Sequence, residues 1–181
     1  GNSATNRSGA SGGGIWTYGD VTVTDSTITE NSVQNRGGGI LAYGNATVTG
    51  STFTGNSASY LGSGTDRPGE GAGIWIGGDA TVMASTITGN SARAEGGGIY
   101  ASGELQVTAS AVSNNSASSG GGIWSNGSLT VTCSTIAGNS VSKKGGGTYT
   151  LGTLTVRNSI IALNEAASDK DFWLDGPLLS E

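Results

Sequence analysis

The 181-residue chain lacks histidine altogether and contains a single cysteine. Without histidine, the chain has neither the usual general base of enzymes near neutral pH nor the commonest side-chain ligand of metals. Because Cys133 is alone, no disulfide can form within the chain, and a single cysteine indicates neither an oxidising nor a reducing compartment. We therefore expect a protein that is not an enzyme and that carries no cofactor and no metal.

Charged residues and long apolar runs are scarce as well. Lys and Arg number 8 against 13 Asp and Glu, which gives a net charge of −5. Because an acidic chain repels phosphate backbones, a nucleic acid partner is not expected. No apolar run approaches the roughly 20 residues of a membrane-spanning helix, and no basic amphipathic stretch favours a membrane surface.

Glycine, in contrast, is abundant at 34 residues, and it recurs with a period. A phrase of three small residues, a β-branched residue and a large apolar one begins at Gly12, Gly37, Gly71, Gly96, Gly120 and Gly145. A second phrase ends in an asparagine column: Asn31, Asn56, Asn90, Asn115, Asn139 and Asn164. These asparagines are 25, 34, 25, 24 and 25 residues apart, so one repeat carries 34 − 25 = 9 extra residues, in an insertion at about 60–70. Such a period indicates stacked structural repeats.

Each repeat contains three short apolar segments, which in the first repeat centre on Ile15, on Val21 and Val23, and on Ile28. Their period-two alternation and β-branched residues predict strands, and the Gly, Asn and Asp between them predict turns. The sequence therefore predicts an all-β, right-handed parallel β-helix of about six three-strand rungs over residues 1–164. Residues 165–181 leave the repeat, and we expect them to form a C-terminal cap or the start of a linker.

The asparagine column is expected to be structural. An asparagine at a turn can hydrogen-bond backbone groups and its stacked neighbours through the side-chain amide. Cys133 falls in another repeated position, which elsewhere holds Asp25, Gly50, Ala84, Ala109 and Asn158. We interpret that position as a turn that accepts small residues.

Five aromatic residues follow directly after the inward residue of the first strand, so alternation directs them outward. This aromatic stripe comprises Trp16, Trp75, Tyr100, Trp124 and Tyr149, with Leu41 in the second rung. An exposed aromatic stripe can bind sugar rings or a partner protein. It can equally stabilise the rod by stacking between rungs or by packing on a loop, and both interpretations stay open.

Threonines flank the inward valines of the second strand. The paired ones are Thr22, Thr24, Thr47, Thr49, Thr130 and Thr132. Regular Thr-x-Thr arrays on solenoids resemble the ice-binding faces of several antifreeze proteins, so ice binding is an alternative function. Met83, Gln106 and Arg157 interrupt the array, and threonine is also an ordinary solvent-facing strand residue.

A third and less favoured function is that of a polysaccharide lyase. Pectate-lyase-like enzymes share the β-helix and use Ca²⁺ held by converging carboxylates together with a basic residue. The nearest candidates here are Asp66 and Glu70 in the insertion and Asp79 after it. The acidic residues are otherwise scattered along the chain.

The alternation of Gly-Gly-small-Ile with aliphatic-x-x-Asn-Ser-Ala resembles the polymorphic outer membrane protein repeat of chlamydial-type surface proteins. Those repeats carry Gly-Gly-Ala-aliphatic and Phe-x-x-Asn, and the latter occurs here only at Phe53 to Asn56. The resemblance covers about residues 1–164. It implies a β-helical passenger or stalk exposed outside the cell, with adhesion as the usual role.

The phrase at Gly1 to Ala4 recurs at Gly55 to Ala58, so we expect the chain to begin inside a repeat. We interpret it as a non-enzymatic structural or adhesive segment of a longer bacterial protein, secreted or at the cell surface. Glycans or surface proteins are the expected partners, and such a rod can also associate with itself side by side or end to end.

Overall fold

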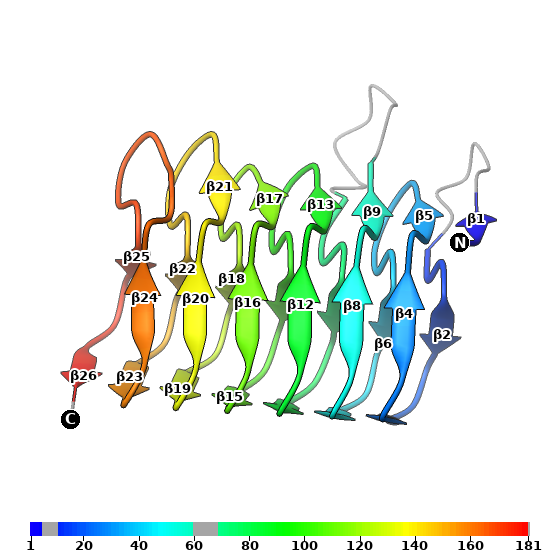
Figure 1. Ribbon diagram of the computed structural model, residues 1–181, viewed down its shortest axis with the longest axis horizontal. Helices are drawn as coiled ribbons and strands as arrows, with labels where there is room; N and C mark the ends of the chain where they lie inside the picture. Colours follow the sequence, from blue (N-terminus) through cyan, green and yellow to red (C-terminus); the bar gives the residue numbers. More distant parts are fainter. Residues whose placement is uncertain (5–10, 60–68, 181) are drawn as a thin grey trace.

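The chain winds into a parallel β-solenoid of about six turns (Figure 1). The computed structural model describes residues 1–4, 11–59 and 69–180. Within these ranges every strand pair is parallel, and no segment is helical, so no apolar helix of membrane-spanning length occurs there. The predicted fold class, an all-β parallel β-helix with turns of about 25 residues, is confirmed.

Four sheets run along the rod, because each complete turn contributes one strand to each sheet. The first sheet contains β2 (Ile15–Thr17), β6 (Ile40–Ala42), β10 (Ile74–Ile76), β14 (Ile99–Ala101), β18 (Ile123–Ser125), β22 (Thr148–Thr150) and β25 (Phe172–Leu174). The second contains β3 (Val21–Thr24), β7 (Ala46–Thr49), β11 (Ala80–Met83), β15 (Leu105–Thr108), β19 (Leu129–Thr132), β23 (Leu154–Arg157) and β26 (Leu178–Ser180).

The third sheet contains β4 (Thr27–Thr29), β8 (Thr52–Thr54), β12 (Thr86–Thr88), β16 (Ala111–Ser113), β20 (Thr135–Ala137) and β24 (Ile160–Ala162). The fourth contains β1 (Ser3–Ala4), β5 (Ser32–Val33), β9 (Ser57–Ala58), β13 (Ser91–Ala92), β17 (Ser116–Ala117) and β21 (Ser140–Val141). The sequence pattern predicts only three strands per turn. The fourth strand is not apparent from the sequence, because two residues are too few to display an alternation.

Equivalent residues pair between turns, and this register builds the core. Ile40 pairs with Ile74 and Val48 with Val82, and all four side chains are fully buried. The inward residues of the first three sheets form one continuous apolar cluster along the rod. Burial of this column from water is the main force that holds the turns together. Two polar residues, Thr148 and Thr150, also face inward and are fully buried. Their hydroxyls have no hydrogen-bond partner in the described part of the chain.

The turn between the second and third sheets requires a left-handed backbone. Its six residues have φ values between 46° and 60°, and they are Asp25, Gly50, Ala84, Ala109, Cys133 and Asn158. A side chain with a Cβ is strained in this region, which favours glycine, asparagine, aspartate and other small residues. Cys133 occupies this turn in its repeat because its side chain is small, and its thiol is exposed.

The asparagines of the repeat form a buried ladder between the third and fourth sheets. In each link, one side-chain oxygen accepts two hydrogen bonds from the asparagine of the preceding turn. The backbone N of Asn90 lies 3.0 Å, and its Nδ2 2.9 Å, from Oδ1 of Asn115. The same Nδ2 donates to the carbonyl of Phe53 at 3.1 Å. Each amide thus satisfies polar groups that would otherwise be buried without partners.

The ladder ends on an aspartate from residues 165–181. This segment adds β25 to the first sheet and β26 to the second. Just before β25, Asp171 occupies the position that Gly147 has one turn earlier, and its Oδ1 accepts from N and Nδ2 of Asn164 at 3.2 and 3.1 Å. A carboxylate oxygen therefore takes the place of the next asparagine.

The asparagine ladder predicts that one substitution lowers the stability of the fold substantially. In Asn90→Ala, the N and Nδ2 of Asn56 lose an acceptor, and the Phe53 carbonyl loses a donor. We expect the free energy of unfolding to fall by about 3 kcal/mol, since each buried unsatisfied group costs about 1–3 kcal/mol. Chemical denaturation followed by circular dichroism measures this change. The control is Asn45→Ala, in which an exposed turn loses one bond to the Asp79 N–H; equal losses in the two variants would contradict a special role of the ladder.

Candidate functional site

The structure places the predicted aromatic residues in one column of the first sheet. Strand pairing brings Trp75 beside Tyr100, Tyr100 beside Trp124, and Trp124 beside Tyr149. Trp173 of β25 continues the column beyond Tyr149. At the other end, Trp16 pairs with the buried Leu41.

From Trp75 to Trp173 the rings stack with nearly parallel planes. The ring centroids are 5.6, 6.5, 3.8 and 4.0 Å apart in successive pairs, with interplanar angles of 4°, 3°, 7° and 19°. Stacked pairs of this kind stabilise a fold by about 0.5–1.5 kcal/mol each beyond their burial. The short separations show that Trp124, Tyr149 and Trp173 cover one another's faces, whereas the wider ones place the Tyr100 ring offset from its two neighbours.

Two tyrosines outside the predicted stripe extend the column of aromatic rings near β2 and β6, and we call the whole column the aromatic ladder. Tyr18 lies 4.5 Å from Trp16 in an edge-to-face contact and 5.4 Å from Tyr43 in a stacked one, and Tyr43 contacts Trp75 at 5.5 Å. Tyr18 is 74% exposed, Trp16 48% and Tyr43 43%. We call Trp16, Tyr18 and Tyr43 the open aromatic cluster. Neither tyrosine is apparent when the repeats are aligned, because each lies two residues after the aromatic position, directly after β2 or β6.

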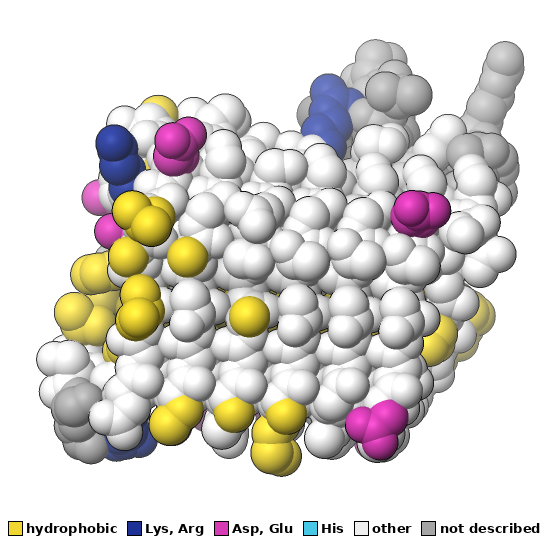
Figure 2. Space-filling view, in the orientation of Figure 1, with side chains coloured by type: hydrophobic (Ala, Val, Ile, Leu, Met, Phe, Trp, Pro, Cys, Tyr) yellow, Lys and Arg dark blue, Asp and Glu magenta, His cyan; other side chains and the backbone are white. Residues whose placement is uncertain are grey.

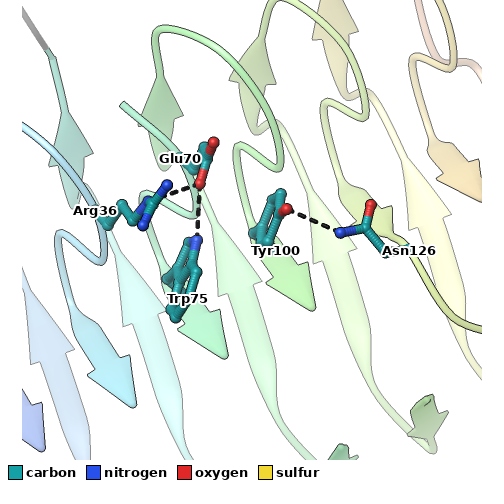
Figure 3. Close-up of polar contacts among 5 residues, drawn as sticks. All are labelled: Arg36, Glu70, Trp75, Tyr100 and Asn126. Atoms are coloured by element: carbon teal, nitrogen blue, oxygen red, sulfur yellow. Dashed lines mark hydrogen bonds and ion pairs between the residues drawn. The ribbon is translucent and has the colours of Figure 1, made fainter. Parts of the chain in front are cut away.

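The side chains of Arg36, Glu70 and Trp75 contact one another in the middle of the stripe (Figure 3). We call them the charged triad. Glu70 Oε2 accepts from Arg36 Nε and from Trp75 Nε1, both at 2.9 Å, and the Arg36 guanidinium lies 5.1 Å from the Trp75 ring centroid. Next to it, Asn126 donates to the Tyr100 hydroxyl at 3.0 Å. Trp75, Tyr100 and Glu70 are buried, and Glu70 Oε2 is occupied by its two donors.

The other members of the suggested lyase group do not join Glu70 in a described site. Asp66 lies outside the described residues, and Asp79 Oδ1 accepts from the Glu104 N–H in an exposed turn. Across residues 1–4, 11–59 and 69–180, no three Asp, Glu, Cys or His side chains converge as metal ligands would.

A groove opens beside the last aromatic rings. It has a volume of about 470 Å³, and it is lined by Ser119, Trp124, Ser142, Lys143, Lys144, Tyr149, Ala167 and Ser168. Lys144 Nζ lies 5.6 Å from the centroid of the Trp173 ring. We call this feature the lysine groove.

Between the triad and the lysine groove lies a half-buried carboxylate, Glu95. Burial and the nearby charge of Glu70 raise its pKa above the ordinary value of 4.5, while Lys143 and Arg36 partly oppose the shift. Burial and the Glu70 and Glu95 charges likewise raise the pKa of the Tyr100 hydroxyl, although its side-chain hydrogen bonds oppose the rise. Burial, and then the charges of Glu95 and Asp175, also raise the pKa of the Tyr149 hydroxyl, and Tyr149 lines the groove. The negative charge of Glu95 therefore reaches the groove.

The threonines predicted as an ice-binding array lie on the outer side of the second sheet, in register. Thr22 pairs with Thr47 and Thr24 with Thr49. Thr130 pairs with Gln106 and Thr155, while Thr132 pairs with Thr108 and Arg157. Thr22, Thr24 and Thr47 are exposed, whereas the other three predicted residues are partly exposed. Figure 2 looks onto the neighbouring third sheet, whose outer face is mostly polar and uncharged, while apolar side chains gather at the end that carries β24.

Residues 84–102, from the turn after β11 to the first residue after β14, match the family model described as the Chlamydia polymorphic membrane protein (Chlamydia_PMP) repeat. No curated protein and no solved structure matches the chain significantly. The predicted resemblance is confirmed over these residues, which lie within a parallel β-solenoid as a repeat of this type would. The match indicates a β-helical segment of a surface or outer membrane protein.

The raised pKa of Glu95 predicts a pH-dependent effect of Glu95→Gln. The folded state binds this proton more tightly than the unfolded state, so the ionised carboxylate opposes folding above its folded pKa. The variant should have a higher Tm than the parent at pH 7, and the difference should shrink as the pH falls towards 4.5 and below. Thermal unfolding across this pH range tests it, with the exposed Glu104→Gln as control. A lower Tm at pH 7 would mean that attraction to Lys143 outweighs burial.

Proposed function

We propose that the chain is a non-enzymatic, structural and adhesive segment of a β-helical surface protein, and that the open aromatic cluster contacts its partner. The observation that carries the proposal is the exposure of three neighbouring rings on a rod whose other described Trp and Tyr rings are stacked or buried. Exposed aromatic clusters mark binding surfaces because their burial releases a large apolar area from water. Glycans and surface proteins are the partners that such rings suit.

The cluster is also held in place before any partner arrives. The backbone of β2 is bonded to β6, and ring contacts fix Tyr18 between Trp16 and Tyr43. A preorganised surface loses little conformational entropy on binding. The remaining turns then act as a stiff spacer, since adjacent turns are joined strand to strand in parallel register.

Removal of the exposed rings tests the adhesive role. The double variant Tyr18→Ser, Tyr43→Ser should lose binding to immobilised glycans or surface proteins by about tenfold or more, since aromatic hot spots contribute about 2 kcal/mol or more. The matched control is Phe172→Ser, which removes a ring that is 40% exposed in β25. If the parent chain binds neither class of partner, the adhesive role is lost and a spacer remains.

Ice binding is a second candidate, and the register of the threonines favours it. Thr22, Thr24, Thr47 and Thr49 form a two-by-two array, although Met83 and Gln106 break its continuation. If this face orders water, the chain should show thermal hysteresis, and Thr47→Lys should abolish it. Ser142→Lys adds the same charge at an exposed site outside the array. Absence of hysteresis at millimolar concentration of the parent chain would exclude this function.

A further inference from the structure

The lysine groove and the charged triad occupy the same place relative to the aromatic ladder. Arg36 and Glu70 pair across turns immediately before the first sheet, and Lys144 pairs with Ser168 at the equivalent position four turns after Arg36. In both places a cation lies over an indole ring, Arg36 at 5.1 Å from Trp75 and Lys144 at 5.6 Å from Trp173.

The two places differ in one component, the carboxylate. Glu70 bridges Arg36 and Trp75 at 2.9 Å. By contrast, in the part of the chain that the structure describes, no carboxylate lies within 4.0 Å of Lys143 or Lys144. Glu95 attracts Lys143 only over a longer distance. The groove thus repeats the cation and the ring of the triad and lacks its anion.

The rest of the lining suits a polyhydroxylated ligand. Ser119, Ser142 and Ser168 line the groove, and among the described residues their hydroxyls form no hydrogen bond. A volume of about 470 Å³ falls within the usual range of about 300–1,000 Å³ for small-molecule sites. The backbone beneath the lysines is fixed, since the Lys143 N–H donates to Ser118 and its carbonyl accepts from Ser168.

We infer that the lysine groove binds a carboxylated sugar of the uronic acid type. The sugar carboxylate takes the position relative to Lys144 and Trp173 that Glu70 takes relative to Arg36 and Trp75. Its ring lies along the edges of Trp124 and Tyr149, and its hydroxyls bond the free serines. This inference rests on the proposed adhesive function and gives it a second, chemically distinct contact at the other end of the ladder.

The experiment titrates the 181-residue chain with trigalacturonic acid and follows Kd by calorimetry and tryptophan fluorescence. The trimethyl ester of the same sugar keeps the rings and hydroxyls and removes the charge. Acetylated, amidated triglutamate keeps three carboxylates and removes the sugar. Lys144→Gln tests the groove, and Lys170→Gln removes an equal, exposed charge that does not line it.

We expect trigalacturonic acid to bind, with about fivefold weaker binding to Lys144→Gln and unchanged binding to Lys170→Gln. The ester and triglutamate should both bind at least about tenfold more weakly than the acid. If the ester binds as tightly as the acid, the groove does not recognise the carboxylate. If triglutamate binds as tightly as the acid, the groove does not recognise the sugar. No binding of the acid at about 10 mM, where a site of only a few kcal/mol would fill, overturns the site itself.

Failure of this site is distinguishable from failure of the adhesive function. The Tyr18→Ser, Tyr43→Ser variant keeps the lysine groove, and Lys144→Gln keeps the open aromatic cluster. If adhesion persists in the parent chain and trigalacturonic acid does not bind, only the groove assignment fails. If trigalacturonic acid binds and the open cluster has no partner, only the contact proposed for the cluster fails.

Discussion

The hydrogen bonding of each turn to the next is the constraint on which this structure depends. A parallel strand leaves unpaired backbone groups on both edges, so every turn must place its strands in register with its neighbours. Turns of 24 or 25 residues achieve this, and Ile40 still pairs with Ile74 although 34 residues separate them. The extra residues lie between β9 and β10, where lengthening the chain leaves the strand register unchanged.

Register also decides what the outward columns can do. When aromatic residues occupy the same outward position in successive turns, neighbouring rings lie close enough to stack. Stacking uses the ring faces, which are also the surfaces that sugars and partner side chains would contact. The same geometry that stabilises the rod therefore withdraws its middle rings from binding and leaves the two ends of the ladder available, where Tyr18 is open and where Trp173 has a cation beside it.

The sequence predicted the features that repeat, and it missed those that occur once or are too short to repeat visibly. The inward column and the asparagine positions could be aligned because the core and the ladder demand the same residue in every turn. Leu41 interrupts the aromatic column, and Tyr18 and Tyr43 bridge the gap from positions two residues after the column, which alignment by column cannot detect. Asp171 stands in the place of Gly147, and only the hydrogen bonds of Asn164 explain it.

A solenoid can vary its chemistry in one column without changing its backbone. The position before the small-residue triplet holds Arg36, Glu70, Glu95, Ser119 and Lys144 in five successive turns. Because the strand register fixes the spacing, the order of these side chains alone decides where charges cancel and where they do not. Arg36 and Glu70 neutralise each other over Trp75, and the uncharged Ser119 separates Glu95 from Lys144. The charge of Glu95 still reaches Lys143 and Tyr149, but among the described residues no carboxylate forms an ion pair with Lys144, so an anion bound there displaces no internal partner.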